Sequence, residues 1–74
     1  MRKLSGPLIQ AAREQFGETR DQTAAGVGKS YPTIQQYELG IIAPPANVLA
    51  ALADRYGVPV DSFYAEADDL AGAR

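Results

Sequence analysis

Apolar residues of this 74-residue chain recur in short helical patterns that glycine and proline interrupt. In the first segment the apolar positions share one helix face: Leu8, Ile9, Ala12 and Phe16. Gly6 and Pro7 mark its start because proline favours the first turn of a helix, and Gly17 marks its end. The pattern therefore predicts an amphipathic helix over residues 6–16.

A second apolar segment lies in the C-terminal half of the chain. Its inward positions follow the same helical spacing: Val48, Leu49, Leu52, Ala53 and Tyr56. Pro45 marks the start of this predicted helix, and Gly57 marks its end. Pro59 or Asp61 then opens a short fifth helix. Three apolar residues belong to it: Val60, Phe63 and Tyr64.

Between these segments the chain predicts two short helices joined by a tight turn. Thr19 and Gln22 form a capping box, in which each side chain satisfies a backbone N–H of the first turn. Gly28 can adopt positive φ, so the chain can turn sharply there. Ser30 caps the second short helix, and Gly40 ends it.

The spacing within residues 19–40 indicates how the two short helices pack. A small side chain at Ala24 lets the second helix cross closely over the first, Gly28 makes the corner, and Ile34 fills the space between them. Further inward positions are Val27 and Tyr37. This arrangement is typical of a helix-turn-helix, which presents its second helix to the major groove of DNA.

Residues 19–40 resemble, without a gap, the Cro/repressor-type helix-turn-helix family, also called the xenobiotic-response-element family. The resemblance continues from Pro44 to Asp61 and so covers most of the chain. It implies an all-α fold, namely a compact five-helix lambda-repressor-like DNA-binding domain over residues 1–65. Residues 66–74 then form a short acidic tail.

The resemblance also implies that the exposed face of the second motif helix meets base edges. The residues it assigns to base reading are Ser30, Tyr31, Pro32, Gln35 and Gln36. Gln36 is the strongest candidate, because a primary amide can donate to and accept from adenine in the major groove. Tyr31 can offer its ring to a thymine methyl group and its hydroxyl to a phosphate. The simpler alternative is that Gln35 and Gln36 only keep the helix surface polar.

Phosphate contacts are expected from two basic residues of the motif, Arg20 and Lys29. Arg20 begins the first motif helix, where the helix dipole also favours an anion. Family members usually carry glutamine where Arg20 stands, and apolar residues where Thr23 and Lys29 stand. The loop after Gly40 is usually rich in basic residues and is apolar here, Ile41 to Ala43. These departures lower the expected number of phosphate contacts.

A net charge of −2 contrasts with the basic balance expected of a nucleic-acid binder. Four charged residues lie beyond the last predicted helix: Glu66, Asp68, Asp69 and Arg74. Without them the chain has six basic and six acidic residues, so the body is neutral. Arg2 and Lys3 form a candidate N-terminal arm. The charge deficit supports an alternative function, an antitoxin-like or other protein-interaction module whose acidic surface binds a protein partner.

The composition does not support catalysis. The chain has no cysteine and no histidine, so it lacks a thiolate nucleophile, zinc-finger ligands and the usual general base. Residues 28–30 (GKS) end like a phosphate-binding loop, but that loop needs glycine where Thr23 stands and a strand before it. Glu14, Glu18 and Asp21 suit a solvated helix face better than paired carboxylates. We therefore expect no enzyme, cofactor or metal site.

The expected binding mode is a dimer on double-stranded DNA, because one recognition helix reads too few base pairs to find its site. The apolar surfaces available for a homodimer are in the loop after Gly40 and in the last helix: Ile41, Ile42, Val60, Phe63 and Tyr64. At least one of Val60 and Phe63 is also expected to close the monomer core. The protein would act as a repressor by occupying a palindromic operator. No apolar run reaches the length of a membrane span, so the expected compartment is the cytoplasm.

Overall fold

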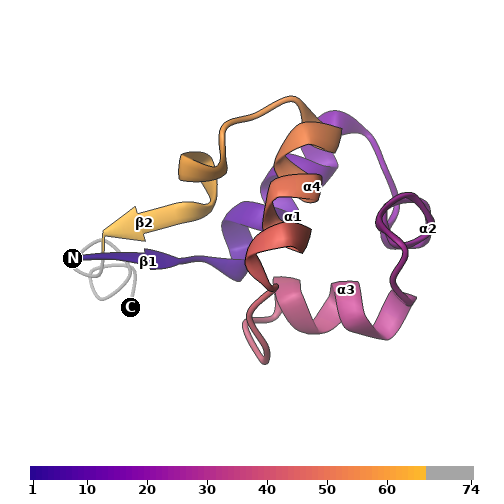
Figure 1. The fold of residues 1–74 in the computed structure, drawn as a ribbon, viewed down its shortest axis with the longest axis horizontal. Coiled ribbons are helices and arrows are strands. Elements are labelled where there is room, and N and C mark those ends of the chain that lie inside the picture. The colour runs from indigo at the N-terminus through magenta and orange to yellow at the C-terminus, as the bar shows by residue number, and fades with distance from the viewer. Residues whose placement is uncertain (67–74) are drawn as a thin grey trace.

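Four α-helices and a two-stranded antiparallel sheet make up residues 1–66, the part of the chain that the computed structural model describes (Figure 1). In chain order the elements are β1 (Arg2–Leu4), α1 (Gly6–Phe16), α2 (Arg20–Val27), α3 (Tyr31–Glu38), α4 (Ala46–Tyr56), a short 3-10 helix η1 (Val60–Phe63) and β2 (Tyr64–Glu66). Except for Glu66, the predicted acidic tail over residues 66–74 lies outside the described residues. Within residues 1–66 no helix has the length and apolar character needed to cross a lipid bilayer.

The helices α1 and α4 have the bounds that the apolar pattern predicts. Ser5 caps α1 by accepting a hydrogen bond from the backbone N–H of Leu8 at 3.3 Å. The helix α4 starts after Pro45 without a side-chain cap. Their boundaries were predictable because the signals that set them lie within a few residues of each end.

The prediction of a five-helix, all-α fold is wrong at the C-terminal end. The fifth helix is a single 3-10 turn, in which the Ser62 backbone N–H donates to the Pro59 carbonyl at 3.0 Å. Tyr64 already belongs to the strand β2. The four residues Val60–Phe63 are too few to form a stable α-helix. The chain then continues as an extended strand, because its backbone pairs with β1.

The strands β1 and β2 pair in antiparallel register, with Lys3 opposite Ala65. The backbone N–H of Ser5 donates to the carbonyl of Phe63 at 2.8 Å and extends the pairing into η1. Figure 1 shows the sheet beside the helices, at the opposite end of the molecule from α2. The sheet therefore holds the two ends of residues 1–66 together without taking part in the motif.

The core lies between the four helices and η1. Its buried apolar residues are Ile9, Ala24, Ile34, Tyr37, Val48, Leu49, Leu52, Ala53, Tyr56 and Phe63. All five inward positions predicted for α4 are among them. The prediction for Phe16 is wrong, since this last residue of α1 is 49% exposed, with its ring centre 5.7 Å from that of Tyr56. Arg13 is buried instead, four residues after Ile9 on the same helix face.

The helix α1 begins directly against the end of α3. A Cβ atom on Gly6 would lie 2.7 Å from the carbonyl oxygen of Tyr37 and closer still to that of Glu38. Any side chain at Gly6 would therefore push the two helices apart. The approach also brings the positive end of the α1 dipole to the carbonyl end of α3, which is electrostatically favourable. This contact fixes the C-terminal end of α3 relative to the rest of the fold.

Candidate nucleic-acid interface

The helices α2 and α3 are joined by the turn that the sequence predicts. The Thr19 backbone N–H donates to the Gln22 side chain at 2.8 Å, and the Gln22 N–H donates to the Thr19 hydroxyl at 3.1 Å. Gly28 has a φ of 71°, in the left-handed region, so α2 ends and the chain turns toward α3. Ser30 caps α3 by accepting a hydrogen bond from the Thr33 N–H at 3.4 Å. The capping box, turn and cap are therefore confirmed.

The helix α3 is buried on one side and exposed on the other. Ile34 and Tyr37 point into the core, as predicted, together with Ala24 of α2. Three base-reading candidates lie on the exposed side: Tyr31, Pro32 and Gln36. Gln35 is half-buried, and neither glutamine amide takes part in a side-chain hydrogen bond within residues 1–66. Gln36 thus presents a free amide on the outer face of α3.

Ser30 differs from the other base-reading candidates because its hydroxyl is used locally. Besides accepting from the backbone of Thr33, it lies 3.0 Å from the Thr33 hydroxyl. A residue that holds the first turn of α3 in this way has little freedom to follow a base edge. Its exposed position at the start of α3 is nevertheless the predicted one.

The two phosphate-binding candidates have different surroundings. Lys29 is exposed in the turn between α2 and α3 and has no ion-pair partner within the described part of the chain. Arg20, at the start of α2, donates from Nε to Glu38 at 2.9 Å and places Nη1 3.5 Å from the Tyr31 hydroxyl. These bonds, to Tyr31 and then to Glu38, raise the pKa of Arg20 above its ordinary value. Arg20 is thus a permanent cation that the fold already holds in place.

Glu38 joins α1, α2 and α3 through buried hydrogen bonds. Its fully buried carboxylate accepts from Arg13 Nε at 2.7 Å and Nη2 at 3.2 Å, and also from Arg20. The hydrogen bond to Glu38 raises the pKa of Arg13. Sequence reasoning missed this cluster. The signal was present, because Arg13 follows Ile9 by four residues and Glu38 follows Ile34 by four, which puts both charges on inward faces.

A second polar cluster supports α2 from the other side. Glu18 accepts two hydrogen bonds from Arg55 of α4, at 2.8 and 2.5 Å, and a third from the Thr23 hydroxyl at 2.8 Å. The bonds from Arg55 lower the pKa of Glu18. The interpretation of Glu18 as a solvated residue is therefore wrong. Thr23 is fully buried and also lies 3.0 Å from the Tyr56 hydroxyl, so a polar cluster replaces the apolar contact that the family usually has there.

Ion pairs leave few basic side chains for an anionic partner. Arg13, Arg20 and Arg55 are paired within the helices. Arg2 bonds to Asp61 at 3.0 Å, so the candidate N-terminal arm is folded back against η1. Among residues 1–66, Lys29 is consequently the cation beside α3 that is free of an ion pair.

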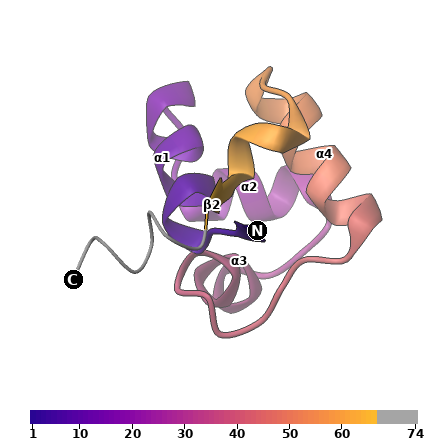
Figure 2. The ribbon, with the colours of Figure 1, turned by 90° about the vertical axis from the view of Figure 1, so that its left-hand side faces the viewer.

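The residues predicted for a dimer interface do not form one surface. Phe63 is fully buried in the core and is not available to a partner, so this assignment is wrong. Ile41 and Ile42 are 65% and 43% exposed, directly after α3. Val60 is exposed and Tyr64 half-buried, but η1 and the loop containing Ile41 lie at opposite sides of the molecule in both views (Figures 1 and 2).

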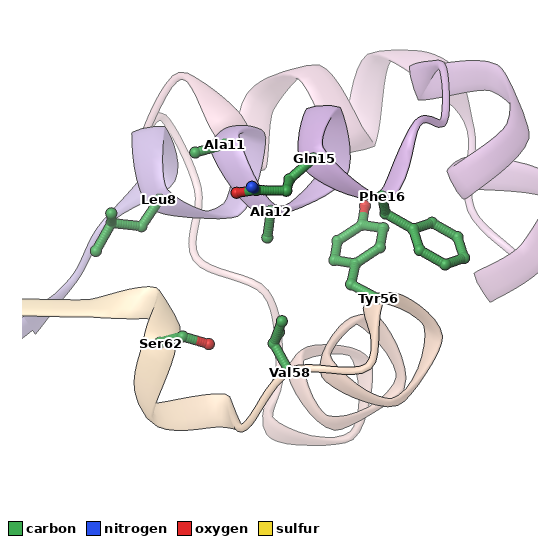
Figure 3. A pocket seen from close by; sticks show the side chains of 8 residues that line it. All are labelled: Leu8, Ala11, Ala12, Gln15, Phe16, Tyr56, Val58 and Ser62. Atoms are coloured by element: carbon green, nitrogen blue, oxygen red, sulfur yellow. The ribbon is translucent and has the colours of Figure 1, made fainter.

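An apolar groove of about 410 Å³ lies away from α3. It runs between α1 and the segment from the end of α4 to η1 (Figure 3). The side chains that line it are Leu8, Ala11, Ala12, Gln15, Phe16, Tyr56, Val58 and Ser62. None of the side chains that line the groove belongs to α2 or α3, so the groove is not part of the candidate nucleic-acid interface.

This geometry defines a DNA-binding domain of the helix-turn-helix class. The helix-turn-helix family model matches residues 9–63, and the chain belongs to this family. The resemblance of residues 19–40 to the Cro/repressor type is thereby confirmed.

A solved structure to which the chain is similar is that of the P22 c2 repressor protein in complex with synthetic operator 9T, in the presence of Tl⁺. The two share 26% sequence identity, with a TM-score of 0.75, over 82% of this chain and 92% of the repressor chain. No curated protein sequence matches the chain.

Proposed function

We propose that this protein is a sequence-specific transcriptional repressor that binds a palindromic operator as a dimer, with α3 in the major groove. The observation that carries this proposal is the exposed side of α3, where Gln36 offers a free amide from a helix whose other side is buried in the core. The likeness to the P22 c2 repressor, solved on an operator, supports it. Such a repressor prevents transcription by occupying its site, and we place it in the cytoplasm with the DNA.

Base reading is assigned to the exposed face of α3. Gln36 would pair with adenine, while Tyr31 and Pro32 would contact bases beside it near the start of the helix. Gln35 is half-buried and suits a phosphate or an edge contact. Ser30 contributes by fixing the first turn of α3.

Phosphate binding is assigned to Lys29 and Arg20. Lys29 is exposed between the two motif helices. The Nε and Nη1 atoms of Arg20 face Glu38 and Tyr31, which leaves Nη2 for a phosphate beside the start of α2. Two cations in each subunit make a weak electrostatic footprint, so affinity would depend less on salt than it does for strongly basic DNA-binding proteins.

Dimerisation is assigned first to the apolar loop after α3. Leu39, Ile41 and Ile42 are all exposed there, and clustered apolar side chains on a small protein indicate a contact surface. The loop directly follows α3, so a symmetric contact through it can set the distance between two recognition helices. That distance should be about 34 Å, one turn of DNA. Val60 and Tyr64 form the alternative interface.

Selection of bound sequences from a random DNA pool tests the proposal. We expect an inverted repeat, and Gln36→Ala should weaken binding by about 1–3 kcal/mol and relax one base pair in each half-site. Gln15→Ala, on the exposed side of α1, is the matched control and should change neither property. Recovery of no preferred sequence would refute the proposal. Ile41→Asp with Ile42→Asp should abolish cooperative binding, whereas the same loss from Val60→Asp alone would move the interface to η1.

A second candidate function is binding to a protein partner, as an antitoxin-like module does. The ion pairing of Arg2, Arg13, Arg20 and Arg55 favours it, because little basic surface remains for DNA. The same selection experiment separates the two functions. A protein that recovers no sequence alone, but does so with a co-purified partner, would have protein binding as its primary role.

A further inference from the structure

A short chain of contacts runs from the core to the start of the recognition helix. Glu38 is fully buried and accepts hydrogen bonds from Arg13 and Arg20 on its two carboxylate oxygens. In residues 1–66 no buried side-chain nitrogen or oxygen lacks a partner. The carboxylate is therefore fixed from two sides, and it fixes Arg20 at Nε in turn.

Arg20 is positioned to act on Tyr31. Its Nη1 lies 3.5 Å from the Tyr31 hydroxyl, and its guanidinium carbon lies 6.0 Å from the centre of the Tyr31 ring. The Arg20 side chain is only 20% exposed, whereas Tyr31 is 40% exposed at the first position of α3. Both side chains, with Arg13, line a polar hollow beside the start of α2. An exposed tyrosine at a helix start has several rotamers open to it, and contacts with a fixed guanidinium restrict them.

We propose that Arg20 is a positioning residue for Tyr31, anchored by Glu38, and that this trio sets the base preference at the end of the half-site that Tyr31 meets. The inference rests on the proposed function, because it requires Tyr31 to contact DNA. The planar guanidinium of Arg20 is essential to this positioning of Tyr31. One arginine can donate to the carboxylate through Nε while a different nitrogen faces the tyrosine hydroxyl, and a lysine ammonium cannot reproduce that fork.

Arg20→Lys is the decisive variant because it keeps the positive charge and loses the fork. We expect the dependence of DNA affinity on salt to stay as in the wild type, since the number of cations is unchanged. The preference at one base pair in each half-site should fall about fivefold or more. In a Tyr31→Ala background the same substitution should have no further effect on preference.

The matched control is Arg55→Lys. Arg55 also holds a carboxylate through Nε and a terminal nitrogen, but it does so on Glu18, away from Tyr31. The Arg55→Lys substitution should leave the base preference unchanged. The inference would be overturned if Arg20→Lys kept the wild-type base preference. It would also be overturned if the effects of Arg20→Lys and Tyr31→Ala on base preference added independently.

Glu38→Gln tests the anchor, with circular dichroism used first to establish folding. A folded variant should relax the same base pair as Arg20→Lys, and a folded variant with wild-type preference would overturn the anchoring role. If Glu38→Gln does not fold, the base preference of Arg20→Lys alone decides whether the inference stands. Failure of the proposed function is recognised separately, since the wild-type protein would then select no sequence at all.

Discussion

The substitution Thr23→Val tests whether the polar cluster beneath α2 stabilises the fold. Thr23 has one hydroxyl hydrogen, which it donates to Glu18 at 2.8 Å. The Tyr56 hydroxyl, 3.0 Å away, must therefore donate to the Thr23 oxygen. Valine keeps the branched shape of threonine in this fully buried position and removes both hydrogen bonds.

The expected loss follows from what each partner keeps. A hydrogen bond to a charged group is worth about 1.5–3 kcal/mol, and Glu18 retains its two bonds from Arg55, so the lower end applies. The buried Tyr56 hydroxyl loses its acceptor, at a cost of about 1–3 kcal/mol. The additional buried methyl group offsets about 0.8 kcal/mol. The free energy of unfolding should therefore fall by about 2–4 kcal/mol, a large share of the roughly 4–11 kcal/mol expected for a domain of this size.

Urea unfolding followed by circular dichroism measures this loss. With a slope of about 1 kcal/mol per molar urea, the midpoint should fall by about 2 M or more. Thr33→Val is the matched control, because it removes only the exposed hydrogen bond to the Ser30 hydroxyl. Tyr56→Phe should cost less in the Thr23→Val background than in the wild type. Equal midpoints for Thr23→Val and Thr33→Val would refute the reasoning.

Three further predictions concern pH, packing and salt. Arg55 lowers the pKa of Glu18 below 4.5, so the stability from this pair is present above that pH and is lost as pH falls through the folded-state pKa. Acid titration of unfolding should show a shallower loss in Glu18→Gln, and identical pH profiles would contradict this. Gly6→Ala should destabilise the protein by about 1–3 kcal/mol in urea unfolding, because the new Cβ meets backbone carbonyls at the end of α3. Pro7→Ala, at the exposed neighbouring position, should have a smaller effect. Equal effects of the two substitutions would count against the close approach of α1 to α3. Lys29→Ala should make the plot of log affinity against log salt shallower by about 2 for a dimer, one phosphate in each subunit, and an unchanged slope would remove Lys29 from phosphate binding.

The parts of the fold that were predictable from the sequence are those with local causes. The bounds of α1 and α4, the capping box at Thr19 and the turn at Gly28 all depend on residues close together in the chain. The exposed position of Gln36 followed from the helix-turn-helix spacing, and its role in base reading stays a prediction.

The features that sequence reasoning missed depend on distant residues. The pairing of β1 with β2 joins the two ends of residues 1–66, and three-residue strands carry no periodic signal. Arg13 and Glu38 had the spacing of inward positions, but charged residues are normally interpreted as surface residues unless a partner is identified. Arg13 and Glu38 are 25 positions apart in the sequence, so their pairing is evident only in the folded structure.

The small sheet also has a consequence for how the protein opens. It closes a loop that contains all the helices of residues 1–66, and closing a long loop costs more chain entropy than forming a local contact. We therefore expect β1 and β2 to pair last during folding and to separate first in the native state. Separation would break the hydrogen bond between Ser5 and Phe63 and uncover the Phe63 ring, while α2 and α3 keep their own caps. Amide protons of Lys3, Ser5 and Ala65 should then exchange with solvent faster than those of Ile34 and Leu52.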